Sequence, residues 1–119
     1  MSLKFSLKSG MVPVTLEVDG AVVEMELREM TAAARDSYLD RLSSRMKFDN
    51  EGKPAGVKKF EGMQSELIGA CLFRQESGKA VTSQEIQGWP ASVVSDIYKA
   101  AQELNHLNVE GKAEPPPKD

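Results

Sequence analysis

The chain has 119 residues, a length that fits one domain with one hydrophobic core. It is 40% hydrophobic and 28% charged, an ordinary globular balance, and its net charge is −3. This negative balance, without any run of Lys or Arg, argues against nucleic acid as a partner, because phosphate contacts need a concentrated basic surface. No apolar run approaches the roughly 20 residues of a membrane helix, and the N-terminus lacks the apolar block of a signal peptide. We therefore expect a cytoplasmic protein that does not bind membranes.

The clearest local signal lies between Val12 and Leu27, where two alternating segments flank Asp19-Gly20. Both turn residues tolerate a positive φ angle, so they predict a two-residue β-hairpin turn. In the register that this turn sets, one face is apolar throughout and the other is largely polar. We expect a hairpin that is buried on one side only. The apolar pairs are Val18 with Ala21, Leu16 with Val23, Val14 with Met25, and Val12 with Leu27.

A further strand is expected near the N-terminus, where Leu3, Phe5 and Leu7 alternate with polar residues. A tight turn at Ser9-Gly10 would align this segment with the first hairpin strand. However, the alignment places Pro13 where the ladder needs a donor, and Pro has no N–H. We therefore expect a looser connection or a bulge at this point.

The region after the hairpin predicts helices. Thr31 is a suitable N-cap for the first helix, and a second helix is expected over roughly Val57–Phe73. Between them, the polar segment near 47–56 predicts a mobile loop. Gly62 and Gly69 would lie near the same side of the second helix, where another backbone could approach; an internal helix is favoured over a partner chain. The apolar stripes are Ala34, Tyr38, Leu39, Leu42 and Met46 in the first helix, and Phe60, Met63, Leu67, Ile68, Cys71 and Leu72 in the second.

Two more helices are expected towards the C-terminus. Thr82 and Glu85 have the spacing of a capping box, and Pro90 suits the first turn of the last helix. Residues 109–119 are polar and Pro-rich and predict a disordered tail. The last helix has an apolar stripe of Val93, Ile97, Ala101, Leu104 and Leu107, flanked by Val94, Tyr98 and Ala100.

Together these elements predict a single α+β domain over residues 1–108. An N-terminal antiparallel β-hairpin or small sheet would occupy residues 1–27. About four helices in residues 28–108 would pack against its apolar face and against one another.

Residues that could perform catalysis or bind a cofactor are scarce. Cys71, the only Cys, lies in an apolar run without a nearby His as a base, which favours a buried inert thiol. His106, the only His, lies at a helix end, where a solvated or helix-terminal role is favoured over that of a general base. No metal-ligand, phosphate-loop or dinucleotide-binding spacing is present. We expect no catalytic site, no metal and no cofactor.

Trp89, the only Trp, has two possible roles. It can be a packing residue that fixes the direction in which the last helix begins, and this role is favoured. It can also be an exposed aromatic anchor, since Trp is enriched among binding hot spots. The helix that follows could accept a partner helix on part of its apolar face. The candidate partner-binding residues are therefore Trp89, Val94, Tyr98 and Ala101.

The order of features from Leu27 to Asn108 resembles the tail assembly chaperones of tailed bacteriophages and prophages. The resemblance rests on "LREMTAAARDSYLDRL", on the glycine-containing helix in the middle, and on "ESGKAVTSQEIQGWPASVVSDIYKAAQELNHLN". It implies a non-enzymatic protein of the bacterial host cytoplasm that binds the tape measure protein and keeps its apolar helical segments soluble. It also implies a role in assembling the tail tube protein around the tape measure protein. In many relatives, a frameshift near the end of this reading frame yields a longer product that recruits tail tube subunits.

Other functions stay open at this point. One is a structural tail or head-completion protein, which would persist in the phage particle. Another is a bacterial adaptor module unrelated to phage, and a small hydrolase is the most distant alternative. The sequence also leaves homo-oligomerisation open.

Overall fold

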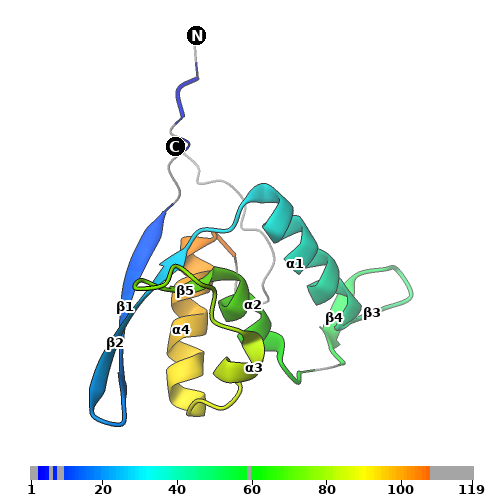
Figure 1. The fold of residues 1–119 in the computed structure, drawn as a ribbon. Coiled ribbons are helices and arrows are strands. Elements are labelled where there is room, and N and C mark those ends of the chain that lie inside the picture. Colours follow the sequence, from blue (N-terminus) through cyan, green and yellow to red (C-terminus); the bar gives the residue numbers. More distant parts are fainter. Residues whose placement is uncertain (1–2, 6, 8–9, 59, 108–119) are drawn as a thin grey trace.

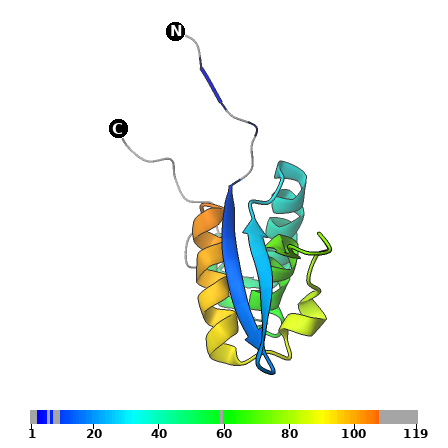
Figure 2. The ribbon, with the colours of Figure 1, turned by 60° about the vertical axis from the view of Figure 1, so that its left-hand side comes forward.

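A computed structural model describes residues 3–5, 7, 10–58 and 60–107 (Figure 1). Strands β1, β2 and β5 form an antiparallel sheet in that order, and β3 pairs with β4 in a separate hairpin. The helices pack against one face of the three-stranded sheet (Figures 1 and 2). The predicted α+β fold, an N-terminal antiparallel sheet followed by four helices, is confirmed. The elements are β1 (Met11–Val18), β2 (Ala21–Arg28), α1 (Ala32–Ser44), β3 (Met46–Phe48), β4 (Pro54–Val57), α2 (Met63–Cys71), β5 (Leu72–Arg74), α3 (Ser83–Ile86) and α4 (Ala91–Leu104).

The β1–β2 hairpin has the register that its turn predicts. Val18 pairs with Ala21, and the ladder runs back to Met11 opposite Arg28 without a bulge. Asp19 and Gly20 both have positive φ angles, of 50° and 81°, as a two-residue turn of this kind requires. The apolar face is buried most deeply at Met25 and Leu27. The predicted one-sided hairpin is therefore confirmed.

The N-terminal segment does not form the additional strand that its alternation predicts. Leu3, Phe5 and Leu7 are exposed, and none of the described residues before Gly10 belongs to a strand. The third strand of the sheet is β5 instead, which pairs with the opposite side of β2. Within the described part of the chain, β1 is consequently an edge strand. Pro13 fits there, because an edge strand tolerates a missing donor.

The predicted loop near 47–56 is wrong in part, because β3 and β4 form a small hairpin there. The Asp49 carboxylate orders its turn by accepting hydrogen bonds from the backbone N–H groups of Glu51 and Lys53, both at 2.9 Å. Gly52 and Gly56 have positive φ angles in the same hairpin. Apart from the buried Met46, the side chains of these short strands are largely exposed, so no alternating hydrophobic pattern reveals the strands.

The second helix is shorter than predicted. It begins at Met63, since Val57 belongs to β4, and it ends at Cys71, where the chain becomes β5. Gly62 is the N-cap, with a φ angle of 75°, and is not inside the helix. Gly69 is inside, and a Cβ atom there would lie 3.2 Å from the backbone nitrogen of Ser83. The expected internal backbone approach is therefore found at Gly69 but not at Gly62.

The helix caps in the structure largely match those predicted from the sequence. Thr31 and Thr82 are the N-caps of α1 and α3, and their hydroxyl oxygens accept hydrogen bonds from Ala34 and Glu85. The Glu85 carboxylate, however, pairs with Arg74. Pro90 is the N-cap of α4, one position earlier than expected.

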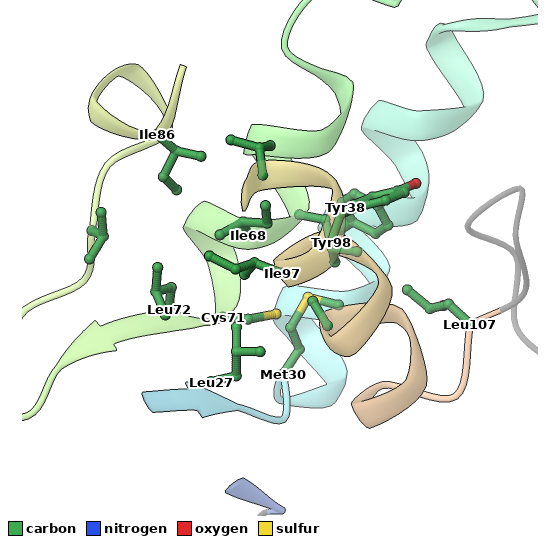
Figure 3. Packing of buried hydrophobic residues seen from close by; sticks show 14 of the residues in the cluster. Leu27, Met30, Tyr38, Ile68, Cys71, Leu72, Ile86, Ile97, Tyr98 and Leu107 are labelled. Atoms are coloured by element: carbon green, nitrogen blue, oxygen red, sulfur yellow. The ribbon is translucent and has the colours of Figure 1, made fainter. Parts of the chain in front are cut away.

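The core is a cluster of buried side chains between the sheet and the helices (Figure 3). In α4 the buried face is rotated slightly from the predicted stripe: Val94, Ile97, Tyr98 and Ala101 are buried, whereas Val93 and Leu104 are half-buried. The predicted stripe of the first helix is confirmed at Tyr38 and Leu42; Met46 is buried too, but it belongs to β3 and not to α1. The predicted tail at 109–119 lies outside the described residues.

Asn105, at the C-terminal end of α4, is a buried polar side chain with three hydrogen-bond partners. Its Oδ1 accepts a hydrogen bond of 2.8 Å from the backbone N–H of Met30, in the link between β2 and α1. Its Nδ2 donates to the carbonyl of Ala101 at 2.8 Å and to the sulfur of Cys71 at 3.3 Å. Asn105 is only 3% exposed, so these bonds are shielded from water. One amide thus joins α4 to α2 and to the start of α1.

We predict that Asn105→Ala lowers the free energy of unfolding by about 2–3 kcal/mol, because it leaves the buried N–H of Met30 without an acceptor. Urea unfolding followed by circular dichroism measures this loss. Glu103→Ala, an exposed change on the same helix, is the control and should shift stability by less than about 0.5 kcal/mol. Equal stabilities of the two variants would contradict the role given to Asn105.

Candidate partner-binding cleft

A cleft of about 570 Å³ lies where the start of α2, the end of α3 and the start of α4 meet. Among the described residues that line it, none has a charged side chain. A second cleft of about 570 Å³, beside β2 and the turn after β5, differs in being lined by Glu24, Arg74 and Glu76. The first cleft is therefore the better match to an apolar occupant. Its lining residues are Phe60, Gly62, Met63, Gln64, Ser65, Ile86, Gln87, Trp89, Ala91, Val94 and Tyr98.

Backbone geometry fixes the position of the main aromatic residue of the cleft. The N–H groups of Gly88 and Trp89 donate to the carbonyls of Glu85 and Ile86, at 3.1 and 3.0 Å, and so turn the chain tightly at the end of α3. Pro90 then begins α4. Trp89 is thus held between two helices on a constrained backbone, which lowers the entropy lost when a partner binds to it.

The cleft has a graded exposure from its rim to its floor. Phe60 at the rim is 71% exposed, Met63 and Trp89 are half-buried, and Val94 and Tyr98 at the floor are 9% and 6% exposed. A partner therefore meets aromatic and sulfur-containing surface first, above a floor that belongs to the core. An exposed Phe next to a half-buried Trp and Met is typical of a binding surface.

The structure brings together three of the four candidate residues from the sequence. Trp89, Val94 and Tyr98 all line the cleft. Ala101 does not; it is fully buried further along α4, so a partner could contact it only if the core opened. Trp89 combines both proposed roles, since it packs against the core and lines the cleft. That these residues contact a partner stays a prediction.

Phe60 and Met63 line the cleft, although the sequence pattern does not predict this. Both fit the apolar stripe of the longer helix that the sequence predicts, so nothing in that pattern separates them from core residues. In the structure Phe60 precedes α2, and Gly62 separates it from Met63 with a left-handed backbone. The one available signal was Gly62 itself, because a glycine near a helix start often marks a change of chain direction.

Tyr98 lies beside Tyr38 of α1 at the floor of the cleft (Figure 3). Burial, and then the neighbouring Tyr98 phenol, raise the pKa of Tyr38, and burial also raises the pKa of Tyr98. The two buried hydroxyls influence each other, but neither has a partner in ordinary hydrogen-bond geometry. Both side chains are therefore neutral parts of the core. Truncating Tyr98 would open a cavity, so this residue is unsuited to a test of binding alone.

The other residues with reactive side chains lie outside the cleft. Cys71 is fully buried, and burial raises its pKa to about 11, against the opposing hydrogen bond from Asn105. The predicted unreactive thiol is consistent with this environment. His106 is exposed just beyond the end of α4, as its helix-terminal assignment predicts.

The described residues hold neither a cluster of metal-ligating side chains nor a membrane-spanning helix. No group of three or more His, Cys, Asp and Glu side chains in the described ranges is arranged to hold a metal ion. Within the same ranges, no helix has the length and apolar character to cross a bilayer.

An ion-pair cluster behind the cleft holds α1 against α2. Glu66 accepts hydrogen bonds from Arg45, whose Nη2 lies 2.7 Å from its Oε2, and from Arg41. Arg45 also donates to the carbonyl of Glu61 at 2.7 Å, next to Gly62 at the cleft. Burial alone would raise the pKa of Glu66, but the hydrogen bonds from Arg45 and Arg41 outweigh it and lower the pKa. The cluster therefore stabilises the start of α2 while Glu66 is ionised.

Comparison of the chain with models of known protein families, with curated proteins and with solved structures gave no match.

We predict that Glu66→Gln lowers the free energy of unfolding by about 1–2 kcal/mol at about pH 7. The folded-state pKa of Glu66 lies below its ordinary value of 4.5, so its contribution is present above that pH and is lost as the pH falls through the folded-state pKa. The difference between wild type and variant should therefore shrink at about pH 3. Urea unfolding at both pH values measures it.

Glu51→Gln is the matched control for this prediction. Glu51 pairs with Lys53 in the exposed β3–β4 hairpin, with side chains 76% and 74% exposed, so its loss should have little effect. A loss for Glu66→Gln that is the same at both pH values would mean that packing, and not charge, is responsible.

Proposed function

We propose that this protein is a phage-type tail assembly chaperone that binds an apolar helical segment of the tape measure protein in the cleft between α2, α3 and α4. The observation that carries the proposal is the uncharged cleft with Phe60, Met63 and Trp89 accessible at and below its rim. An amphipathic helix binds by placing its apolar face into such a groove. The sequence resemblance from Leu27 to Asn108 supplies the class of partner.

The side chains of the cleft suit a chaperone that must accept several related segments. Met63 is flexible and polarizable, so it adapts to side chains of different shape. Trp89 supplies a large rigid contact area at little entropic cost. Directional charges are missing from the described lining residues, so binding would depend on apolar surface more than on one fixed sequence. The acidic net charge of −3 favours solubility of the complex.

In this proposal the protein has no enzymatic activity and acts in the cytoplasm of the bacterial host. It keeps the tape measure protein soluble until the tail tube protein assembles around it. The proposal includes neither nucleic acid nor a membrane as a partner.

Co-expression with a tape measure protein tests the proposal. The wild-type chain should raise the soluble fraction of that protein and co-purify with it. Phe60→Asp should weaken co-purification at least tenfold, because it places a charge at the rim of an apolar cleft. Phe60 is 71% exposed, so this change should leave the stability of the chaperone within about 0.5 kcal/mol.

Phe48→Asp is the matched control, since Phe48 is 49% exposed on β3 and does not line the cleft. It should co-purify like the wild type. Equal binding by the Phe60 and Phe48 variants would rule out the cleft as the binding site. A wild-type chain that neither binds nor solubilises the tape measure protein across a range of salt concentrations would rule out the proposed function.

A further inference from the structure

The N-terminal segment exposes three large apolar side chains on one side of an alternating pattern. Leu3, Phe5 and Leu7 are 78%, 80% and 100% exposed. Leu3–Phe5 lies beyond the end of β1 and away from the rest of the fold in both views (Figures 1 and 2). Lys4 lies on the other side of the alternation. Apolar surface of this extent on a short segment calls for a covering partner.

The outer edge of β1 has backbone N–H and C=O groups that no described strand pairs with, and an added strand could use them. Since the two-residue turn makes Val18 and Ala21 a hydrogen-bonded pair, every second residue of β1 directs its backbone N–H and C=O away from β2. These outward residues are Met11, Pro13, Thr15 and Glu17. Pro13 has no N–H, but the backbone N–H groups of Thr15 and Glu17 are both available to an added strand. No described strand pairs with this edge.

Two tight turns could return the segment to this edge of its own chain, and each conflicts with the sequence or the geometry of β1. The β1–β2 ladder continues through Gly10, whose carbonyl accepts a hydrogen bond of 2.9 Å from the N–H of Glu29. The N–H of Gly10 donates to the Glu29 carboxylate at 3.1 Å. Only two residues separate Leu7 from Gly10, so a tight turn would make these two the hydrogen-bonded closing pair. Gly10 cannot form that pair, because its carbonyl already points towards β2. A turn at Ser9-Gly10 would instead set Ser6 opposite Pro13, which has no N–H to donate.

We propose that the Leu3–Leu7 segment instead adds as an antiparallel outer strand to β1 of a second copy of this chain. In the register that avoids Pro13, Lys4 lies opposite Glu17 of the second copy. Leu3, Phe5 and Leu7 then lie beside Val18, Leu16 and Val14 of that copy. Val18 is 49% exposed and Leu16 and Val14 are half-buried, so the added strand extends an apolar face that is only partly covered.

Charge favours the same register. The outer face of the hairpin carries Glu17, Glu24 and Glu26, and Lys4 would join this acidic face when the apolar residues face the core. A slip by one residue would place Lys4 against the core and expose Phe5 again. The segment therefore complements the β1 edge of its own sequence in both polarity and charge.

Each copy supplies one added strand and one β1 edge, so a reciprocal exchange gives a symmetric dimer in which both β1 edges are paired. The dimer uses a surface apart from the cleft between α2, α3 and α4. It does not depend on the proposed chaperone function.

Disulfide trapping tests the proposed register. Leu3→Cys combined with Val18→Cys should give a covalent dimer on a non-reducing gel after mild oxidation, because the two positions lie side by side in adjacent strands. Leu3→Cys combined with Glu17→Cys is the control, since position 17 faces the other side of the sheet, and it should remain monomeric. A monomeric intrachain disulfide in the first variant, or the same yield of dimer in both, would overturn the proposal.

Sedimentation equilibrium of the full chain tests the association itself. The wild type should reach twice its monomer mass of 13.0 kDa as its concentration rises. Phe5→Asp should lower the association constant of the dimer at least tenfold. Its circular dichroism spectrum should be unchanged, because Phe5 is not part of the core. Phe60→Asp should associate like the wild type. A wild type that stays monomeric, or an equal effect of both variants, would overturn the proposal.

Discussion

The side-chain amide of Asn105 is the interaction on which the arrangement of the helices depends. It satisfies the buried N–H of Met30, binds the carbonyl of Ala101 and contacts the sulfur of Cys71. A buried amide has strict geometric demands, since a polar group left without its partner is costly in the core. Apolar packing alone would allow α4 to slide or rotate against α2. The Asn105 bonds restrict it to one position.

That restriction extends to the other end of α4, where the cleft lies. Ala101, Tyr98, Val94 and Ala91 follow one another at helical spacing, from the Asn105 end of the helix to the cleft. The C-terminal half of α4 therefore belongs to the core, and its N-terminal half forms part of the floor of the cleft. Trp89 stands immediately before α4, where a packed side chain can also present a surface. A firm floor beneath adaptable rim residues is a suitable arrangement for accepting apolar helical segments.

The sequence could predict the parts of the fold that depend on local chemistry. The register of the β1–β2 hairpin follows from Asp19-Gly20 and from a two-residue alternation, which together leave one solution. The N-caps Thr31 and Thr82 are predictable because the first N–H groups of a helix need an acceptor, and a Thr hydroxyl nearby in the sequence supplies one. In each case the determining contacts lie within a few residues of one another.

The parts that could not be predicted depend on tertiary context or on exposed segments. β5 continues directly from α2 and is defined by its pairing with β2, which no local pattern encodes. The β3–β4 hairpin depends on the Asp49 carboxylate and positive-φ glycines rather than on burial. The N-terminal alternation predicts a strand that the described residues before Gly10 do not form. It could not reveal that the β1–β2 ladder continues through Gly10, so that a tight turn closing on Leu7 and Gly10 is excluded.

The same limitation applies to the candidate site. Trp89 stands out as the only Trp, whereas Phe60 resembles one more member of a helical stripe until the helix is known to begin at Met63. The cleft is assembled from three elements separated in the sequence. Its existence therefore becomes apparent only in the fold.

Hydrogen–deuterium exchange of the chain, with and without a soluble helical segment of a tape measure protein, is the most direct test of the central claim. Binding in the cleft predicts added protection around residues 60–65 and 86–98, with little change in the β3–β4 hairpin. Protection confined to the sheet or to the β3–β4 hairpin, with none around Met63 and Trp89, would contradict the claim.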